Sequence, residues 1–259
     1  MQLDFQRYEY KYVIPESLSQ PIRDYIVCYT HPDKFTSNSR SSGYIIRSLY
    51  LDSPNLTFHR AKEQKALNRL KLRIRTYGTQ GDGPIFFEIK RKIKGVIHKR
   101  RVQVREPSWV QHQPNSKDLL VNQSSRNVDV MAEFMELCQR YHVGPSMVVQ
   151  YAREAYESEI DDYARVTFDR CLLGHFPRGY KLTVDEKGWI SLDDPTTMGI
   201  QRATVLELKF ANQAPIWMYD LVQYFGLQRR GFSKYSTAVQ YGLETYFPPY
   251  HHRVSKAFT

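Results

Sequence analysis

The clearest pattern in the chain is the alternation of aliphatic and basic residues over residues 70–75, which read Leu-Lys-Leu-Arg-Ile-Arg. Successive side chains of a β-strand point to opposite faces, so this segment places its basic residues on one face and its aliphatic residues on the other. Strand-like patterns recur along the chain. We predict eight strands, at residues 5–14, 44–51, 67–77, 84–92, 96–105, 147–158, 164–171 and 203–210.

The segments between the strands divide into turns, helices and loops. Gly81-Asp82-Gly83 and Lys94-Gly95 are typical turn sequences, which predicts an antiparallel three-stranded meander over residues 67–105. Helices are expected at residues 15–29, 54–65, 128–141, 215–225 and 233–247, with Ser233 as the N-cap of the last. Residues 30–43 and 106–127 are rich in Ser and Asn, which predicts long loops within a single domain spanning residues 1–259.

The polar face shared by the strands is mostly basic, and it could face either solvent or an interior. An open sheet with its apolar side on helices is the commonest antiparallel arrangement. Over seven strands this arrangement is disfavoured, because like charges directly opposite each other destabilise a sheet. The pattern therefore favours a sheet closed into a barrel, with helices on its apolar outer face and an anion within its polar interior.

The composition agrees with a negatively charged ligand. The 259 residues include 37 Lys and Arg against 27 Asp and Glu, a formal net charge of +10. This excess favours a nucleic acid, a phosphate polymer, a nucleotide or an anionic membrane surface as partner. The three cysteines are widely spaced and odd in number, which indicates a reducing compartment. With no signal peptide and no membrane-length apolar run, we predict a cytoplasmic location.

Carboxylates also occur on the basic face, two residues before a lysine in each case. The pairs are Glu9 and Lys11, Glu88 and Lys90, and Glu207 and Lys209. These pairs are either simple ion pairs or part of a site for a hard divalent cation completed by phosphate oxygens. The chain has no Walker loop, kinase motif set, G-x-G-x-x-G fingerprint, G-x-S-x-G elbow or zinc-like histidine spacing.

An ordered set of short motifs resembles a known family. The motifs lie at residues 7–12, 48–53, 72–78, 87–90, 151–156, 164–169, 205–209 and 231–235. Together they resemble the polyphosphate polymerase domain of the vacuolar transporter chaperone (VTC) family, within the CYTH-like triphosphate tunnel metalloenzymes. The resemblance implies an α+β fold with an antiparallel eight-stranded β-barrel tunnel, basic inside and flanked by helices. It also implies transfer of the γ-phosphoryl of ATP to inorganic polyphosphate with Mn²⁺ or Mg²⁺.

Site residues follow from matching each motif to the family. Glu207 matches the metal-binding glutamate, and Glu88 and then Glu9 are further metal candidates. Arg101 and Lys209 join the phosphate-binding set through their place on the basic face. The full phosphate-binding set is Lys11, Arg73, Arg75, Lys90, Lys99, Arg101, Arg153, Arg165, Lys209 and Lys234. Within it, the candidate catalytic residues are Arg73, Arg75, Lys90, Arg165 and Lys234.

Other functions remain open at this point. The same tunnel could serve a triphosphatase or polyphosphatase, or a non-catalytic polyphosphate-binding module of a membrane complex. The resemblance implies a membrane-protein partner, with a location at the inner face of the membrane through that partner. Eukaryotic members carry a lysine at the position of Gly231, where Arg229 and Arg230 lie nearby. Nucleic acid is disfavoured as a ligand, because most Tyr and Phe lie opposite the basic face.

Overall fold

The computed structural model describes residues 7–39, 43–78, 83–104, 124–161, 163–185, 187–200 and 202–246. The strands are β1 (Arg7–Pro15), β2 (Thr30–Pro32), β3 (Tyr44–Asp52), β4 (Arg69–Tyr77), β5 (Ile85–Ile93), β6 (Val96–Val104), β7 (Gly144–Ser158), β8 (Ala164–His175), β9 (Ile190–Ser191) and β10 (Ala203–Ala211). The helices are η1 (Glu16–Leu18), α1 (Ser19–Ile26), α2 (Lys34–Ser37), α3 (Thr57–Glu63), α4 (Ser125–Arg140), α5 (Pro195–Met198), α6 (Ile216–Tyr224) and α7 (Lys234–Tyr246).

Eight of these strands form an antiparallel ring, which confirms the predicted α+β tunnel fold. The sheet runs in the order β7, β3, β4, β5, β6, β1, β10, β8, and pairing of β8 with β7 closes it. The short strands β2 and β9 pair with the C-terminal parts of β7 and β8, respectively. The ring is not a perfect barrel, because β1 meets β6 through the single pair of Arg7 and Ile97. Strands β4, β5 and β6 are the predicted meander.

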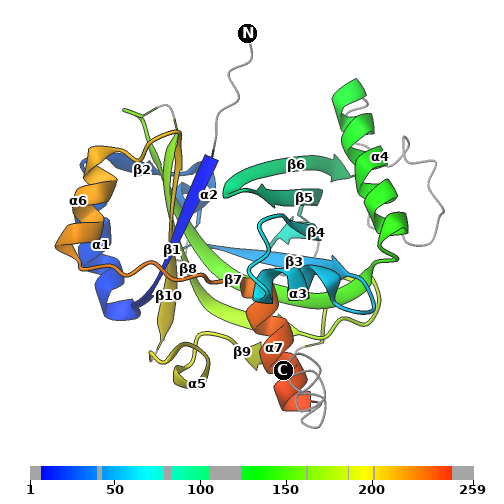
Figure 1. Cartoon of the computed structure of the whole chain (residues 1–259). Coiled ribbons are helices and arrows are strands. Elements are labelled where there is room, and N and C mark those ends of the chain that lie inside the picture. Colours follow the sequence, from blue (N-terminus) through cyan, green and yellow to red (C-terminus); the bar gives the residue numbers. More distant parts are fainter. Residues whose placement is uncertain are drawn as a thin grey trace.

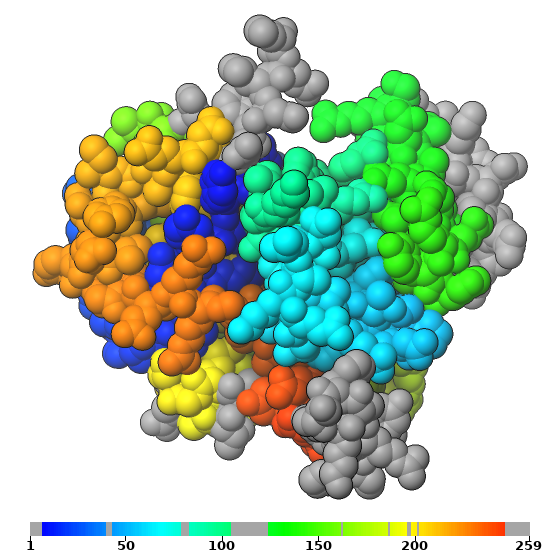
Figure 2. Space-filling view, in the orientation of Figure 1, coloured from blue at the N-terminus to red at the C-terminus, as the bar shows by residue number. Residues whose placement is uncertain are grey.

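Helices cover the outside of the ring, as Figure 1 shows. Aliphatic residues of β4 such as Leu72 and Ile74 are buried outward in a cluster with Phe134 of α4. A second cluster packs α1 and α6 against β1, β8 and β10. Figure 2 shows α6 (orange) and α4 (green) on opposite sides of the molecule. Because these helices cover the aliphatic faces of the strands, the opposite, basic faces line the interior.

The outer core under α4 should dominate stability. Phe87 is 0% exposed, and its ring centroid lies 5.0 Å from that of Phe134. We expect Phe87→Ala to lower the free energy of unfolding by about 3–5 kcal/mol, because it removes buried apolar contacts and leaves a cavity. Denaturant titration measures this change. Val27→Ala is the control, since Val27 is 68% exposed and should cost almost nothing.

The structure corrects the expectation that residues 30–43 form a loop. This segment contains β2, which pairs with β7, and the one-turn helix α2. Asp33 caps α2 by accepting a hydrogen bond from the Thr36 backbone N–H at 2.8 Å. Elements this short show no periodicity to reveal them, and β9 and α5 escaped prediction for the same reason.

The predicted loop at 106–127 lies mostly outside the described residues. Its last residues belong to α4, which begins at Ser125 behind the N-cap Ser124 rather than at Val128. The serine content of this segment predicts a loop, but serine is also a favoured N-cap residue, and Ser124 has that role here. In the part of the chain that the structure describes, no helix is long and apolar enough to cross a membrane.

Candidate functional site

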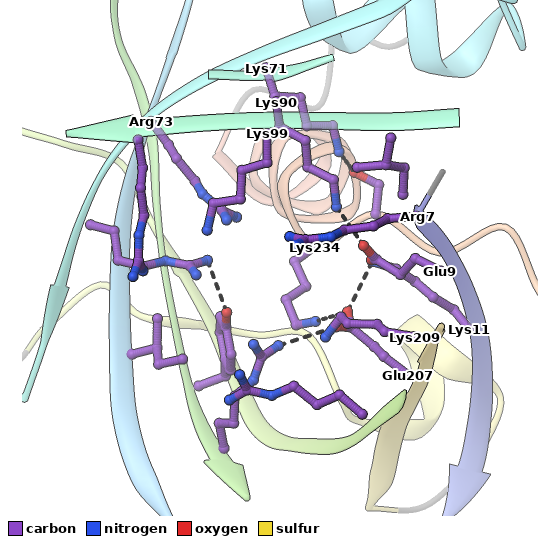
Figure 3. Close-up of a pocket in the computed structure, with 18 of the residues that line it drawn as sticks. Arg7, Glu9, Lys11, Lys71, Arg73, Lys90, Lys99, Glu207, Lys209 and Lys234 are labelled. Carbon is purple, nitrogen blue, oxygen red and sulfur yellow. Dashed lines mark hydrogen bonds and ion pairs between the residues drawn. The ribbon is translucent and has the colours of Figure 1, made fainter. Parts of the chain in front are cut away.

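A strongly basic cavity of about 230 Å³ lies within the ring of strands. Among the described residues, twelve Lys and Arg side chains line it against two carboxylates, Glu9 and Glu207. Figure 3 shows Lys71, Lys90 and Lys99 projecting from one wall toward Lys209 and Glu207 on the other. The basic lining residues are Arg7, Lys11, Lys71, Arg73, Arg75, Lys90, Lys99, Arg101, Arg153, Arg165, Lys209 and Lys234.

The lining set contains all ten residues predicted to bind phosphate. Two further cations, Arg7 and Lys71, were absent from that prediction although their strand positions place them on the basic face. Alternation along β1 and β4 was therefore sufficient to find them. Of the three metal candidates, Glu9 and Glu207 line the cavity, whereas Glu88 is completely buried beside it.

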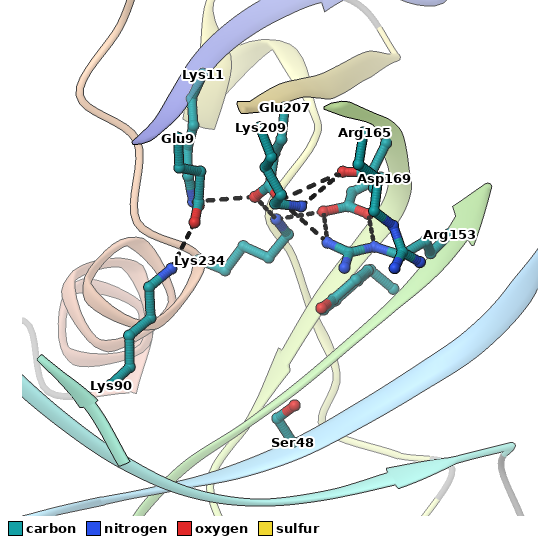
Figure 4. A network of polar contacts seen from close by, with 12 residues as sticks. Glu9, Lys11, Ser48, Lys90, Arg153, Arg165, Asp169, Glu207, Lys209 and Lys234 are labelled. Atoms are coloured by element: carbon teal, nitrogen blue, oxygen red, sulfur yellow. Dashed lines mark hydrogen bonds and ion pairs between the residues drawn. The ribbon is translucent and has the colours of Figure 1, made fainter. Parts of the chain in front are cut away.

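Glu207 of β10 is the centre of the ion-pair network drawn in Figure 4. Its Oε1 lies 3.0 Å from the ammonium nitrogens of both Lys11 and Lys234, and its Oε2 lies 2.7 Å from that of Lys209. Arg153 contacts the same Oε2 at 3.2 Å. Burial alone would raise the pKa of Glu207, but the four cations outweigh it and hold this pKa well below its ordinary value.

Glu9 of β1 is joined to this network through Lys11. The Lys11 ammonium lies 2.9 Å from Glu9 Oε1 and 3.0 Å from Glu207 Oε1, and Lys90 contacts the other Glu9 oxygen at 2.7 Å. Burial works against ionisation of Glu9, but Lys11 and Lys90 keep its pKa well below the ordinary value. Two anionic carboxylates therefore converge on one cation, which is the donor chemistry that suits a hard divalent ion.

Glu88 of β5 lies in a different environment. Its carboxylate is 2.6 Å from the Nε of Arg73 and 2.5 Å from the ammonium of Lys99. Arg75 approaches at 3.8 Å, and despite complete burial these cations hold the pKa of Glu88 well below its usual range. The contacts fix Arg73 and Lys99 against the wall from which they reach into the cavity.

A fourth carboxylate, Asp169 of β8, was not among the predicted site residues. It is 0% exposed and accepts hydrogen bonds from Arg153 Nε at 2.6 Å and Nη2 at 2.7 Å. The Lys234 ammonium also lies 2.5 Å from Asp169. Its place on the same strand face as Arg165 was the sequence signal that could have identified it. The bidentate pair orients Arg153 toward Glu207.

Helix α7 contributes Lys234 to the cavity floor. Ser233 caps the helix, as predicted, by accepting from the Ser236 backbone N–H at 3.2 Å, and it also accepts from Lys71 at 2.7 Å. Tyr235, the second residue of α7, is 1% exposed, and its hydroxyl donates a hydrogen bond to Asp52 at 2.7 Å. Its ring stacks on Tyr50 with centroids 4.8 Å apart. These contacts hold the start of α7, and hence Lys234, against β3.

Two arginines differ in how much of their charge is already matched. Arg75 bonds to the hydroxyl groups of Ser48 at 3.1 Å and Tyr151 at 3.2 Å, with Glu88 no closer than 3.8 Å. Arg165 instead contacts two carboxylates, Asp33 at 2.6 Å and Glu157 at 2.8 Å. Arg75 thus has the larger unmatched charge.

Comparison with known protein families identifies a match over most of the chain. The VTC domain matches residues 6–242. The chain belongs to the VTC domain family. A comparison with curated proteins gave no match.

Several solved structures are similar to this VTC domain at the level of the whole chain. The PH1819 protein of Pyrococcus horikoshii is 14% identical with a TM-score of 0.44, and the match covers 92% of this chain and 98% of that one. A putative adenylate cyclase of Bacillus halodurans is 9% identical with a TM-score of 0.46, covering 88% and 95%. A putative adenylyl cyclase of Hippeastrum with a dominant triphosphatase activity is 12% identical with a TM-score of 0.45, covering 90% and 94%.

The acidic residues of the VTC domain set a limit on how a metal can be held. Within the described residues, no group of three or more His, Cys, Asp or Glu side chains is placed to hold a metal ion. Glu9 and Glu207 nevertheless fit a divalent cation as an oxygen-donor pair, because the Lys11 ammonium contacts both. Mg²⁺ and similar ions are commonly held by one or two carboxylates, with substrate phosphates and water completing the shell.

Proposed function

We propose that this VTC domain is a metal-dependent phosphotransferase that moves the γ-phosphoryl of ATP onto the end of an inorganic polyphosphate chain. The observation that carries the proposal is a cavity inside the ring of strands in which, among the described residues, twelve Lys and Arg side chains face two carboxylates. Such an excess of positive charge in a confined space is unfavourable unless anions neutralise it. The phosphates of a nucleotide and of a polyphosphate carry closely spaced negative charges that can neutralise these cations.

A second basic cavity favours a substrate longer than one triphosphate. We name it the vestibule; its volume is about 160 Å³, and it shares Glu9, Lys11, Lys71, Lys90, Ile97 and Ser233 with the tunnel. In Figure 2 the orange segment after α6 and the cyan α3 lie on its two sides. Its additional cations are Lys62, Arg69, Lys92, Arg229 and Arg230. A chain leaving the tunnel here would remain in contact with cations, as a polymer requires.

Phosphoryl transfer requires the protein to position the substrates and to neutralise their charge; it does not require a strong general base. A terminal oxygen of the polyphosphate is already anionic and attacks the γ-phosphorus directly, while the bond from that phosphorus to the β,γ-bridging oxygen breaks and ADP leaves. Fixed cations stabilise the charge on the transferred group. We assign this role to Arg73, Arg75, Lys90, Arg165 and Lys234, with Lys11, Lys99, Arg101, Arg153 and Lys209 binding the flanking phosphates.

Mn²⁺ or Mg²⁺ is the proposed cofactor, held by Glu207 and Glu9. When bound, the ion would neutralise charge on the phosphoryl oxygens. Lys11 is placed to give way to it, since its ammonium already lies between the two carboxylates. Glu88 does not line the cavity and is engaged by Arg73 and Lys99, so we propose that it serves as their counter-ion.

Transfer to water would make the same site a triphosphatase or polyphosphatase, and product analysis separates the alternatives. Purified protein is incubated with ATP and Mn²⁺, with Mg²⁺ in a parallel sample, and the products are separated on a gel. Long-chain polyphosphate together with ADP is expected. Orthophosphate as the sole product would identify a hydrolase. Polyphosphate binding without turnover would identify a non-catalytic module, and absence of both would refute the proposal.

We also propose a cytoplasmic location, with a membrane-protein partner that brings the domain to the inner face of a membrane. All three cysteines, Cys28, Cys138 and Cys171, are free, in keeping with a reducing compartment. The resemblance to the polyphosphate polymerase domain motivates the partner. Cell fractionation followed by crosslinking tests both ideas; recovery of the protein only outside the cytoplasm, or no crosslink to a membrane protein, would contradict them.

Polyphosphate binding should weaken as the pH rises, because burial lowers the pKa of three lysines that line the cavity, Lys71, Lys99 and Lys209. Burial lowers the pKa of Lys99 to about 7, with Glu88 opposing the shift and Arg75 and Arg73 adding to it. A bound phosphate favours the charged ammonium, so binding takes up a proton. Above this pKa, we expect the affinity for tripolyphosphate to fall by more than about tenfold between pH of roughly 7.5 and 9.5.

Calorimetric titration in two buffers of different ionisation enthalpy measures both the affinity and the proton uptake. Lys99→Arg is the matched control, because guanidinium stays charged throughout this range. It should make the pH profile less steep and reduce proton uptake, while Lys209, whose pKa burial lowers to about 8, still titrates. An identical profile in the wild type and in Lys99→Arg would show that Lys99 is not the titrating group.

A further inference from the structure

One end of the tunnel is bordered by aromatic rings, with the charged residues Asp33 and Lys34 in contact with them. Tyr44 of β3 and Tyr77 of β4 line the cavity. Phe35 of α2 packs on both, with ring centroids 5.4 Å from Tyr44 and 5.2 Å from Tyr77, the latter at an interplanar angle of 3°. Phe86 of β5 meets Tyr77 edge-on at 5.9 Å. We name these four residues the aromatic rim.

The aromatic rim and the vestibule lie at opposite ends of the tunnel. The inward residues of β4 run in the order Lys71, Arg73, Arg75 and Tyr77, and Lys71 also lines the vestibule. Six residues of strand separate Lys71 from Tyr77, which corresponds to about 20 Å. The tunnel is therefore asymmetric, with an opening rich in basic residues at one end and an aromatic opening at the other.

The aromatic rim is partly open to solvent, unlike a ring cluster that serves only to pack a core. Phe35 is 39% exposed, and Tyr44, Tyr77 and Phe86 are half-buried. Arg101 lies over the Phe86 ring, with its guanidinium carbon 4.9 Å from the ring centroid. A single ligand could therefore stack a flat group on these rings while the tunnel cations hold its phosphates. Stacking of a base on an aromatic side chain contributes about 1–3 kcal/mol.

We propose that the aromatic rim binds the nucleobase of the nucleoside triphosphate, whose phosphates extend past Arg75 and Arg73 toward Glu207. This inference rests on the proposed function and adds a direction to it. The nucleotide enters base-outward at the aromatic rim, and the polyphosphate end reaches the γ-phosphoryl from the vestibule. The two substrates therefore occupy opposite halves of one tunnel, with Lys234 and Glu207 between them.

The test compares a ligand that has a base with one that lacks it. Calorimetry measures the Kd of ATP and of inorganic tripolyphosphate for the wild type, Phe35→Leu and Tyr77→Leu in one buffer. We expect the Kd of ATP to rise by about 5- to 100-fold in each variant, the loss of one stacking contact, with the Kd of tripolyphosphate unchanged within twofold. Tyr77→Phe retains the ring and should bind ATP as the wild type does. Tyr224→Leu is the control, since Tyr224 is 77% exposed on α6.

Each outcome decides the matter. An equal loss of affinity for both ligands would overturn the inference, because the rings would then support the tunnel rather than the base. Unchanged ATP affinity in both leucine variants would also overturn it while leaving the proposed function intact, provided that wild type binds tripolyphosphate. Wild-type protein that binds neither ligand would refute the proposed function itself. Circular dichroism of Phe35→Leu checks the fold, which an exposed side chain should not disturb.

Discussion

Glu207→Gln is expected to abolish turnover while leaving polyphosphate binding intact. The substitution keeps the shape of the side chain and removes the negative charge that we propose to hold the metal. A catalytic metal contributes several kcal/mol to transition-state stabilisation, so we expect kcat to fall by about 10³-fold. Polyphosphate affinity should be retained or increased, because a tunnel with twelve cations loses one of its two lining carboxylates. Product assays, polyphosphate titration and the affinity for Mn²⁺ alone measure the three effects.

Glu88→Gln is the matched control for Glu207→Gln. Both glutamates are buried among cations, at 0% and 3% exposed, but Glu88 does not line the cavity. We expect Glu88→Gln to keep the affinity for Mn²⁺ and to lower stability by about 3–5 kcal/mol, since Arg73 and Lys99 lose their counter-ion. Normal turnover in Glu207→Gln, or a loss of Mn²⁺ affinity in Glu88→Gln alone, would place the metal elsewhere.

Arg75→Gln should give the largest loss of phosphate affinity among the arginine variants. Arg75 is 5% exposed and bonds mainly to neutral hydroxyl groups, those of Ser48 and Tyr151. Its charge is thus available to a phosphate, unlike that of Arg153, which Asp169 neutralises. A charge-assisted hydrogen bond contributes about 1.5–3 kcal/mol, and a guanidinium can make two. We expect the Kd of tripolyphosphate to rise by about 100-fold at fixed ionic strength.

Arg47→Gln separates this effect from a loss of folding. Arg47 is a buried arginine on β3 that bonds to Gln150 and to the Leu182 carbonyl, and it does not line the cavity. Its replacement should lower stability without changing the Kd of tripolyphosphate. Arg75→Lys should recover part of the lost affinity, since lysine restores the charge but not the bidentate geometry. An unchanged Kd in Arg75→Gln would remove Arg75 from the binding set.

Local pattern was enough to assign most residues to a face of the sheet. Alternation along β4 placed Arg73 and Arg75 inward and Leu72 and Ile74 outward, and the structure agrees. This works because the direction of a strand side chain depends on its position in the chain and hardly on its neighbours. The same rule places Arg7, Lys71 and Asp169 on the inward face, although no role in the family was matched to these three.

The strand pattern did not distinguish the carboxylates from one another, although the family resemblance ranked Glu207 first as a metal ligand. Glu9, Glu88 and Glu207 each precede a lysine by two residues and share the inward face. Their environments depend on strand pairing: Glu88 lies between Arg73 and Arg101 on its neighbouring strands, whereas Glu9 lies opposite Lys209. Register between strands is a long-range property that no local pattern encodes, so the burial of Glu88 and the approach of Glu9 to Glu207 emerged only in the folded ring.

What the sequence by itself determined is the charge of each strand face, the meander, the five longest of the described helices and, through its ordered motifs, the resemblance to a family. Tertiary structure decided how the ring closes, which carboxylates face the cavity, and that its ends differ, one aromatic and one basic. The short elements β2 and α2, which carry Phe35 to the aromatic rim, had no periodicity to predict them. The position of β2 is fixed by its pairing with β7, which joins residues far apart in the chain. The position of α2 is fixed by the Asp33 cap, a single local contact that forms no repeating pattern.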